Sequence, residues 1–143
     1  MGNLGKIKNM LAEAITYLFI AVFIYTATDK FLNLQSFEGF MVKMIFMQPA
    51  GKYVAIFIPA IEVFIVLLLI FPKSRLRGLQ LTLGLMLLFT GYLLYMKIAA
   101  KMLPCHCGGV ISSLSWTQHI YLNLGLVLLA AYAMKLINHY THN

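Results

Sequence analysis

The stretch GLQLTLGLMLLFTGYLLYM, from Gly78 to Met96, decides the fold of this chain. It contains no charged side chain. A helix needs about 18 or more predominantly apolar residues to cross the roughly 30 Å hydrocarbon core of a bilayer. The stretch reaches that length without interruption, so it predicts a transmembrane helix.

The composition of the whole chain also indicates a membrane protein. Hydrophobic residues make up 62% of the 143 residues and charged residues 10%, whereas soluble domains average about 45–50% and about 25%. A soluble protein of this size has too much surface for its volume to bury so many apolar side chains. The 11 lysines and arginines are scattered, which is typical of contacts with lipid head groups and not of a nucleic-acid-binding face. We therefore expect a lipid bilayer as partner and no nucleic acid, and the composition excludes a water-soluble enzyme and a disordered tail.

Three further apolar runs complete the predicted fold, an all-α bundle of four transmembrane helices in one membrane domain over residues 1–143. Lys6 and Lys8 before the first run resemble the start of a signal peptide. Because no small-x-small cleavage site follows that run, we expect it to be retained. The predicted spans are about 10–28, 53–71, 78–96 and 119–137.

The segment between the first two spans is predicted to be an amphipathic helix in the membrane interface. Its apolar side chains recur at helical spacing, with polar residues between them. These apolar residues are Phe37, Phe40, Met41, Met44 and Ile45. We expect the stretch Gln48 to Gly51, which contains a proline and a glycine, to end this helix.

Four spans place both chain termini on one side of the membrane. The compact basic turn with Lys73, Arg75 and Arg77 lies on that side, and positive turns are typical of the cytoplasmic face. We therefore expect cytoplasmic termini. The loop between the third and fourth spans then faces the periplasm or the cell exterior.

That loop carries Cys105 and Cys107, which are the two cysteines of the chain. Inert thiols are disfavoured, since Pro104 and two glycines flank the pair in place of apolar residues. A structural disulfide is also disfavoured, because loop closure predicts only about 1.5 kcal/mol for so small a ring. Extended backbone separates the two Cα atoms by about 7 Å, at the edge of the roughly 4.4–6.8 Å range of disulfides. The bond therefore needs a bend that makes it easier to reduce, which favours redox exchange.

A metal site is the second-ranked chemistry of this loop. Cys105, Cys107, His106 and His119 supply suitable ligand types, but paired cysteine ligands are usually two to four residues apart. His106 and His119 are also candidates to support a thiolate, since nearby cations favour the ionised thiol. The alternative for each histidine is an interfacial hydrogen-bonding role. We therefore expect a redox pair and assign no metal site.

Glu62 lies near the middle of the second span, where an ionised acid must find a partner or stay protonated. Its functional interpretation is proton transfer or a quinone contact. The alternative is a carboxyl group that ties helices together through tyrosines, for which the candidates are Tyr17, Tyr25, Tyr92 and Tyr95. Asp29 and Lys30 close the first span, and we expect them to be solvated or to form a local ion pair.

Three motifs resemble the MauE/DoxX family of redox-associated membrane proteins. Thr28-Asp29-Lys30-Phe31 ends the first span, and Pro59-Ala60-Ile61-Glu62 is similar to a Pro-x-x-Glu pattern of that family. Cys105-His106-Cys107-Gly108-Gly109, followed by Trp116, is similar to the Cys-x-Cys-Gly-Gly signature of one MauE-like branch. The resemblance covers nearly the whole chain.

The resemblance implies a four-helix bundle in a bacterial inner membrane and an association with thiol–disulfide or quinone-linked electron transfer. MauE accompanies a thioredoxin-like partner in the maturation of a disulfide-rich periplasmic enzyme, and DoxX-like proteins include small subunits of quinone-linked oxidoreductases. We therefore predict thiol–disulfide exchange through Cys105 and Cys107, with a thioredoxin-like protein or quinone as candidate partners. The alternative is a non-catalytic accessory subunit that stabilises a larger membrane protein complex.

Overall fold

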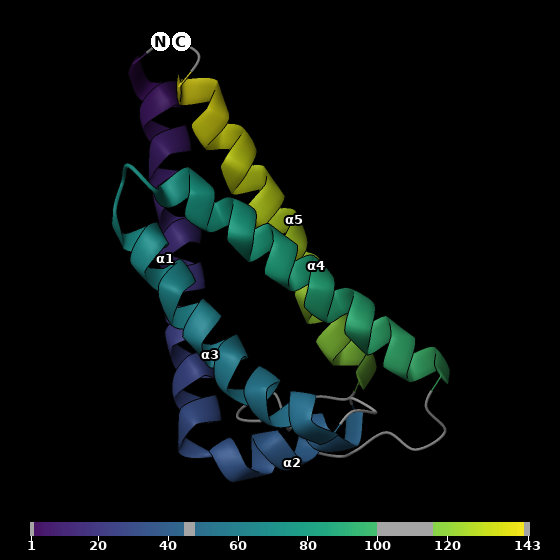
Figure 1. Cartoon of the computed structure of the whole chain (residues 1–143). Coiled ribbons are helices and arrows are strands. Elements are labelled where there is room, and N and C mark those ends of the chain that lie inside the picture. Colours follow the sequence, from purple (N-terminus) through teal and green to yellow (C-terminus); the bar gives the residue numbers. More distant parts are fainter. Residues whose placement is uncertain (1, 45–47, 100–115, 142–143) are drawn as a thin grey trace.

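The computed structural model describes residues 2–44, 48–99 and 116–141, and within these ranges the chain is almost entirely helical (Figure 1). Four of its helices are long and apolar enough to cross a membrane, which confirms the predicted all-α fold with four spans. The helices are α1 (Gly2–Leu32), α2 (Leu34–Met44), α3 (Gln48–Ile70), α4 (Arg75–Ala99) and α5 (Trp116–Thr141).

The observed helices extend beyond most of the predicted spans. α1 already begins at Gly2 and continues to Leu32, because the residues on both sides of its apolar run contain no proline to stop a helix. α3 ends at Ile70, one residue before the predicted end of the second span.

The predicted amphipathic helix exists as α2, which follows α1 after a turn at Asn33. The prediction that Gln48 to Gly51 would end it is wrong, because these residues form the first turn of α3. Proline fits there, since the first turn of a helix does not use its backbone N–H groups for internal hydrogen bonds. The place of α2 in the membrane interface stays a prediction.

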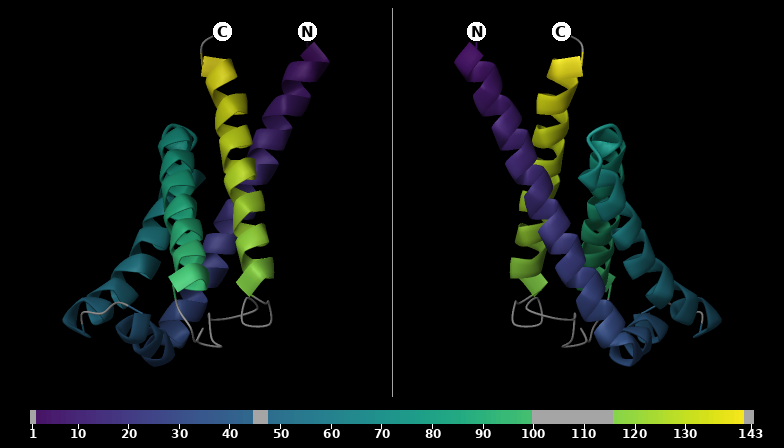
Figure 2. Two further views of the ribbon diagram at one scale, coloured as in Figure 1. Left: turned by 90° about the vertical axis from the view of Figure 1, so that its right-hand side faces the viewer. Right: turned by 90° about the vertical axis from the view of Figure 1, so that its left-hand side faces the viewer.

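The long helices pair in a simple way. α4 packs along α5, and α1 packs along α3. Both chain termini lie at one end of the bundle, whereas α2 runs across the opposite end (Figures 1 and 2). We call these the termini end and the α2 end.

The core joins all four long helices through apolar side chains. Phe19 and Phe23 on α1 are fully buried, with ring centroids 6.2 Å apart. They belong to one cluster with buried residues from α3, α4 and α5, including Ile65, Leu69, Leu79, Ala130 and Ala133. Transmembrane helices gain little hydrophobic free energy when they associate, because lipid tails are as apolar as the side chains. Their association therefore depends on close packing of this kind.

Buried hydroxyl groups within the spans bond their own helices. Thr16, Thr82 and Thr90 each donate to the carbonyl four residues earlier, at 2.8, 2.8 and 2.7 Å. This pattern satisfies the hydroxyl without a partner on another helix. These threonines therefore add polarity to the core without forming an interhelical site.

Two glycines permit close approaches between consecutive helices. A Cβ atom at Gly51 would lie 2.8 Å from the Cα of Val42, so α2 is held directly against the start of α3. A Cβ atom at Gly78 would lie 2.9 Å from a methyl carbon of Leu69, where α4 turns back along α3. A larger residue at Gly51 would meet backbone and force α2 and α3 apart, whereas at Gly78 the Leu69 side chain would have to move.

The α3–α4 turn is fixed at the termini end by polar contacts. The Ser74 hydroxyl donates to the Leu68 carbonyl at 2.8 Å and thereby satisfies an acceptor at the C-terminus of α3. Arg75, the first residue of α4, lies 3.9 Å from the Glu13 carboxylate of α1. The turn is therefore tied to α1 by charge.

Candidate functional site

The cysteine pair predicted from the sequence lies outside the described residues. This applies to Cys105 and Cys107, and to His106 between them. Trp116 is the first residue of α5, and its side chain also lies outside the described part. The site is therefore built from the helix ends that flank this segment.

The flanking helix ends lie together at the α2 end of the bundle. The ammonium group of Lys97, near the C-terminus of α4, donates to the hydroxyl of Thr117 near the N-terminus of α5 at 3.1 Å. This hydrogen bond joins α4 and α5 across the residues that connect them. The two helices are thus held side by side where the cysteine-containing segment leaves one and enters the other.

A buried ion pair lies near the same end. The Lys30 ammonium of α1 donates to Oε1 of the Glu62 carboxylate of α3. The Glu62 side chain is 2% exposed and the Lys30 side chain 18%. The prediction that Glu62 needs a partner is confirmed, but that partner is a lysine on the neighbouring helix. The prediction that Lys30 is solvated or pairs with Asp29 is wrong.

Aromatic side chains from two further helices surround the Lys30 ammonium. It lies 5.7 Å from the ring centroid of Phe37 on α2 and 5.4 Å from that of Phe89 on α4. Both distances fall within the roughly 6 Å at which a cation is attracted to an aromatic face. Thr26, one turn earlier on α1, lies beside the Glu62 carboxylate. The lysine is therefore stabilised by a carboxylate and by two rings.

His119 brings the fifth helix into this arrangement. It lies near the start of α5, half-buried, and close enough to Lys30 for the two side chains to interact electrostatically. Side chains of α1, α2, α3 and α4 thus meet at a single cation, and His119 of α5 lies within electrostatic range of it. We call this set the Lys30 cluster, and it consists of Lys30, Phe37, Glu62, Phe89 and His119.

One atom of the cluster is chemically unsatisfied. Oε2 of Glu62 is buried and accepts no hydrogen bond of ordinary geometry in the described part of the chain, although the Thr26 side chain lies beside the carboxylate. A carboxylate offers about four lone-pair sites across its two oxygens, and leaving a buried acceptor unpaired costs about 1–3 kcal/mol or more for a charged group. The arrangement can therefore hold a proton, or a donor of another molecule, at Oε2.

Within residues 2–44, 48–99 and 116–141, no three histidine, cysteine, aspartate or glutamate side chains lie close enough together to hold a metal ion. His119 and Glu62 lie in the described ranges, while Cys105, His106 and Cys107 do not. Within the described ranges the site therefore consists of an ion pair, two aromatic rings and a histidine.

Sequence reasoning missed Lys30, Phe37 and Phe89 as site residues. The signal that points to Lys30 is the scarcity of acids, since the chain has 4 of them. Only Glu62 among these lies deep in a span, and a lysine at the end of the preceding antiparallel span can reach it. The two phenylalanines carry no such signal, because aromatic residues are common throughout apolar helices.

Comparison with known proteins identifies one family. The family model described as "Methylamine utilisation protein MauE" matches residues 8–136. No curated protein and no solved structure matches the chain. The match includes the second and third spans, most of the first and fourth, and the segment between α4 and α5, and it confirms the MauE part of the resemblance. The DoxX part and the Cys-x-Cys-Gly-Gly branch stay predictions. On this match, the chain belongs to the MauE family of membrane proteins.

Proposed function

We propose that this MauE-family membrane protein exchanges disulfides through Cys105 and Cys107 with a thioredoxin-like partner, at the periplasmic face of a bacterial inner membrane. The observation that carries the proposal is the position of the Lys30 cluster. A partly buried cation and a half-satisfied carboxylate lie at the bundle end where α4 and α5, which flank the cysteine pair in the chain, are joined by Lys97 and Thr117.

The proposed exchange moves two electrons and two protons. A thiolate of the reduced pair attacks the disulfide of the partner, which forms a mixed disulfide and releases one partner thiolate. The second cysteine then attacks the mixed disulfide, so that the Cys105–Cys107 bond forms and the second partner thiolate leaves. The partner gains the two protons that the cysteine thiols lose. The reverse sequence reduces the pair at the expense of the partner's dithiol.

The neighbouring groups fit this chemistry. Cations near a thiol favour the thiolate, which is the attacking species. His106 lies between the cysteines in the sequence, and Lys30 and His119 lie at the α2 end. Oε2 of Glu62 has an unused lone pair that can accept a proton. We assign His106 and His119, in their protonated forms, to thiolate support and Glu62 to proton holding, since the charge of Lys30 is already balanced by Glu62.

Thiol trapping in intact cells tests the proposal. The chain has 2 cysteines, so a maleimide of high mass reports zero, one or two free thiols as distinct bands on a denaturing gel. A membrane-impermeant maleimide labels them only if they face the periplasm. Single Cys105→Ser and Cys107→Ser variants are expected to differ, because the variant that keeps the attacking thiol accumulates a mixed disulfide with the partner.

The double Cys105→Ser, Cys107→Ser variant is the matched control, since it keeps all helices and removes both thiols. It is expected to form no intermolecular disulfide and to lose the function of the wild-type chain. Full function in the double variant contradicts the proposal and selects the accessory-subunit alternative, in which the helices alone stabilise a larger membrane complex.

A further inference from the structure

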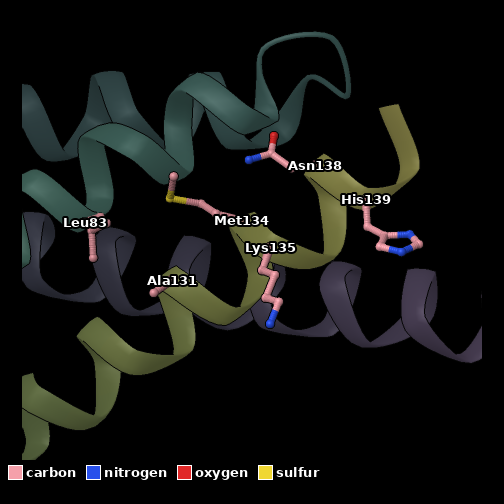
Figure 3. A pocket seen from close by; sticks show the side chains of 6 residues that line it. All are labelled: Leu83, Ala131, Met134, Lys135, Asn138 and His139. Atoms are coloured by element: carbon pink, nitrogen blue, oxygen red, sulfur yellow. The ribbon is translucent and has the colours of Figure 1, made fainter. Parts of the chain in front are cut away.

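An open groove lies on the surface at the termini end, far from the Lys30 cluster. It has a volume of about 540 Å³ and runs along one face of α5 beside α4 (Figure 3). The groove is shallow, because Ala131, Lys135, Asn138 and His139 are all exposed, so it contacts one side of an occupant and leaves the other side to the surrounding lipid. Its lining consists of Leu83, Ala131, Met134, Lys135, Asn138 and His139.

The lining changes from apolar to polar along the axis of α5. Ala131 and Met134 come first, with Leu83 of α4 beside them, and the Met134 side chain points toward α4 (Figure 3). Lys135 and His139 follow, one helical turn apart and on the same face. His139 is the last residue of the apolar span of α5. The polar part of the groove therefore lies toward the membrane surface and the apolar part toward the membrane interior.

The charge around the groove is unbalanced. The chain contains no aspartate or glutamate after Glu62, so neither α4 nor α5 offers a carboxylate to Lys135. The two ion pairs that the described residues form are Lys30 with Glu62 and Arg75 with Glu13, and the latter uses the acid of α1 at this end. An anion from outside the chain is the natural counter-charge for Lys135.

We propose that this groove binds one anionic phospholipid of the leaflet on the termini side. Its phosphate lies at Lys135 and His139, and an acyl chain lies along Leu83, Ala131 and Met134. The groove has a basic part next to an apolar part, just as a phospholipid has a phosphate next to its acyl chains. Basic pockets between transmembrane helices are known sites for anionic head groups, and a lysine near a helix end extends its ammonium toward the interface.

The backbone does not assist this binding. The C-terminus of a helix carries partial negative charge and repels anions. The attraction therefore depends on the side chains, chiefly Lys135. This makes the proposal sensitive to a single substitution.

The test measures which lipid stays bound to the purified full-length chain. The chain is placed in nanodiscs of phosphatidylcholine with about 20% phosphatidylglycerol, and native mass spectrometry counts the retained lipids of each kind. The wild type is expected to retain one phosphatidylglycerol in preference to phosphatidylcholine. Lys135→Gln is expected to lower this retention about five-fold, which corresponds to about 1 kcal/mol per basic residue, and Lys135→Arg is expected to keep it.

Two further variants separate the groove from general attraction. Lys73→Gln removes an exposed charge at the same end but not from the groove, and it is expected to leave retention unchanged. Ala131→Phe fills the apolar floor without changing charge and is expected to lower retention. Equal losses in Lys73→Gln and Lys135→Gln, or unchanged retention in Lys135→Gln, overturn the proposal. Displacement of the lipid by inorganic phosphate also overturns it, because the site then recognises a free anion.

Discussion

Removal of one partner of the Lys30–Glu62 pair is expected to cost far more stability than removal of both. In Lys30→Met, the Glu62 carboxylate keeps its burial, at 2% exposure, and loses its cation. Two unit charges about 4 Å apart attract each other by about 4 kcal/mol at an effective dielectric constant of 20, and breaking a buried pair on one side costs about 3–5 kcal/mol. We therefore expect Lys30→Met to lower the free energy of unfolding by about 3–5 kcal/mol.

The opposite single substitution should cost less. In Glu62→Leu, the Lys30 side chain keeps its 18% exposure and its contacts with the rings of Phe37 and Phe89. Each cation–π contact contributes about 0.5–1 kcal/mol or more when desolvated. In the double variant Lys30→Met, Glu62→Leu no charge remains buried, and replacement of a buried ion pair by apolar side chains is often neutral or stabilising. The double variant should therefore unfold within about 1 kcal/mol of the wild type.

The assay is a double-mutant cycle in mixed micelles, with unfolding by sodium dodecyl sulfate followed through the fluorescence of the single tryptophan, Trp116. Asp29→Asn is the matched control. Asp29 is next to Lys30 in the chain but accepts a hydrogen bond from Asn33 at 3.1 Å, so its loss should cost less than about 1 kcal/mol. A loss in the double variant equal to the sum of the losses in Lys30→Met and Glu62→Leu would mean that the two side chains are not coupled, and would refute the reasoning.

Three further substitutions test the packing that supports the cluster, each in the same unfolding assay. Gly51→Ala should cost about 1–3 kcal/mol, because its Cβ would lie 2.8 Å from the Cα of Val42; Gly39→Ala meets no atom within 4 Å and should be neutral or stabilising, and equal losses at the two glycines would contradict the close approach. Phe19→Ala should cost about 3–5 kcal/mol, because the side chain is 0% exposed; a loss below about 1 kcal/mol would show that the site collapses around the cavity. Thr82→Val should cost less than about 1.5 kcal/mol, because the hydroxyl bonds only its own helix; a larger loss would reveal an interhelical role.

The positions of the spans can be predicted from the sequence, because a transmembrane helix is defined by the length and apolarity of one continuous stretch of residues. An apolar run of sufficient length must be helical, since every backbone group has to be bonded within the segment. Gly78 to Met96 therefore lies inside α4, and the other three runs also lie within helices to within a residue. The ends are less predictable. Pro49 both favours the first turn of a helix and stops a helix that precedes it, and the sequence alone does not distinguish the two.

The ion pair depends on the register between α1 and α3, which no local pattern encodes. Asp29 is adjacent to Lys30 in the chain and was the apparent partner, but Glu62 is level with Lys30 once the two helices pack. The need for a partner was predictable from the cost of a buried charge. The identity of the partner was not, because it follows from helix packing. Cys105 and Cys107 lie outside the described residues, so their role still depends on the sequence and the family.

The uneven distribution of acids links the cluster, the turn and the groove. All 4 acidic residues lie at or before Glu62, while basic residues continue throughout the chain. Every ion pair of the described part therefore uses an acid of this first half, and one of them, between Glu13 and Arg75, crosses to the second half. Hydrophobicity alone does little to fix how apolar helices align in lipid. Ion pairs between helices therefore favour one alignment of the helices over the others. The same imbalance leaves Lys135 with no acid on its own helix or on α4.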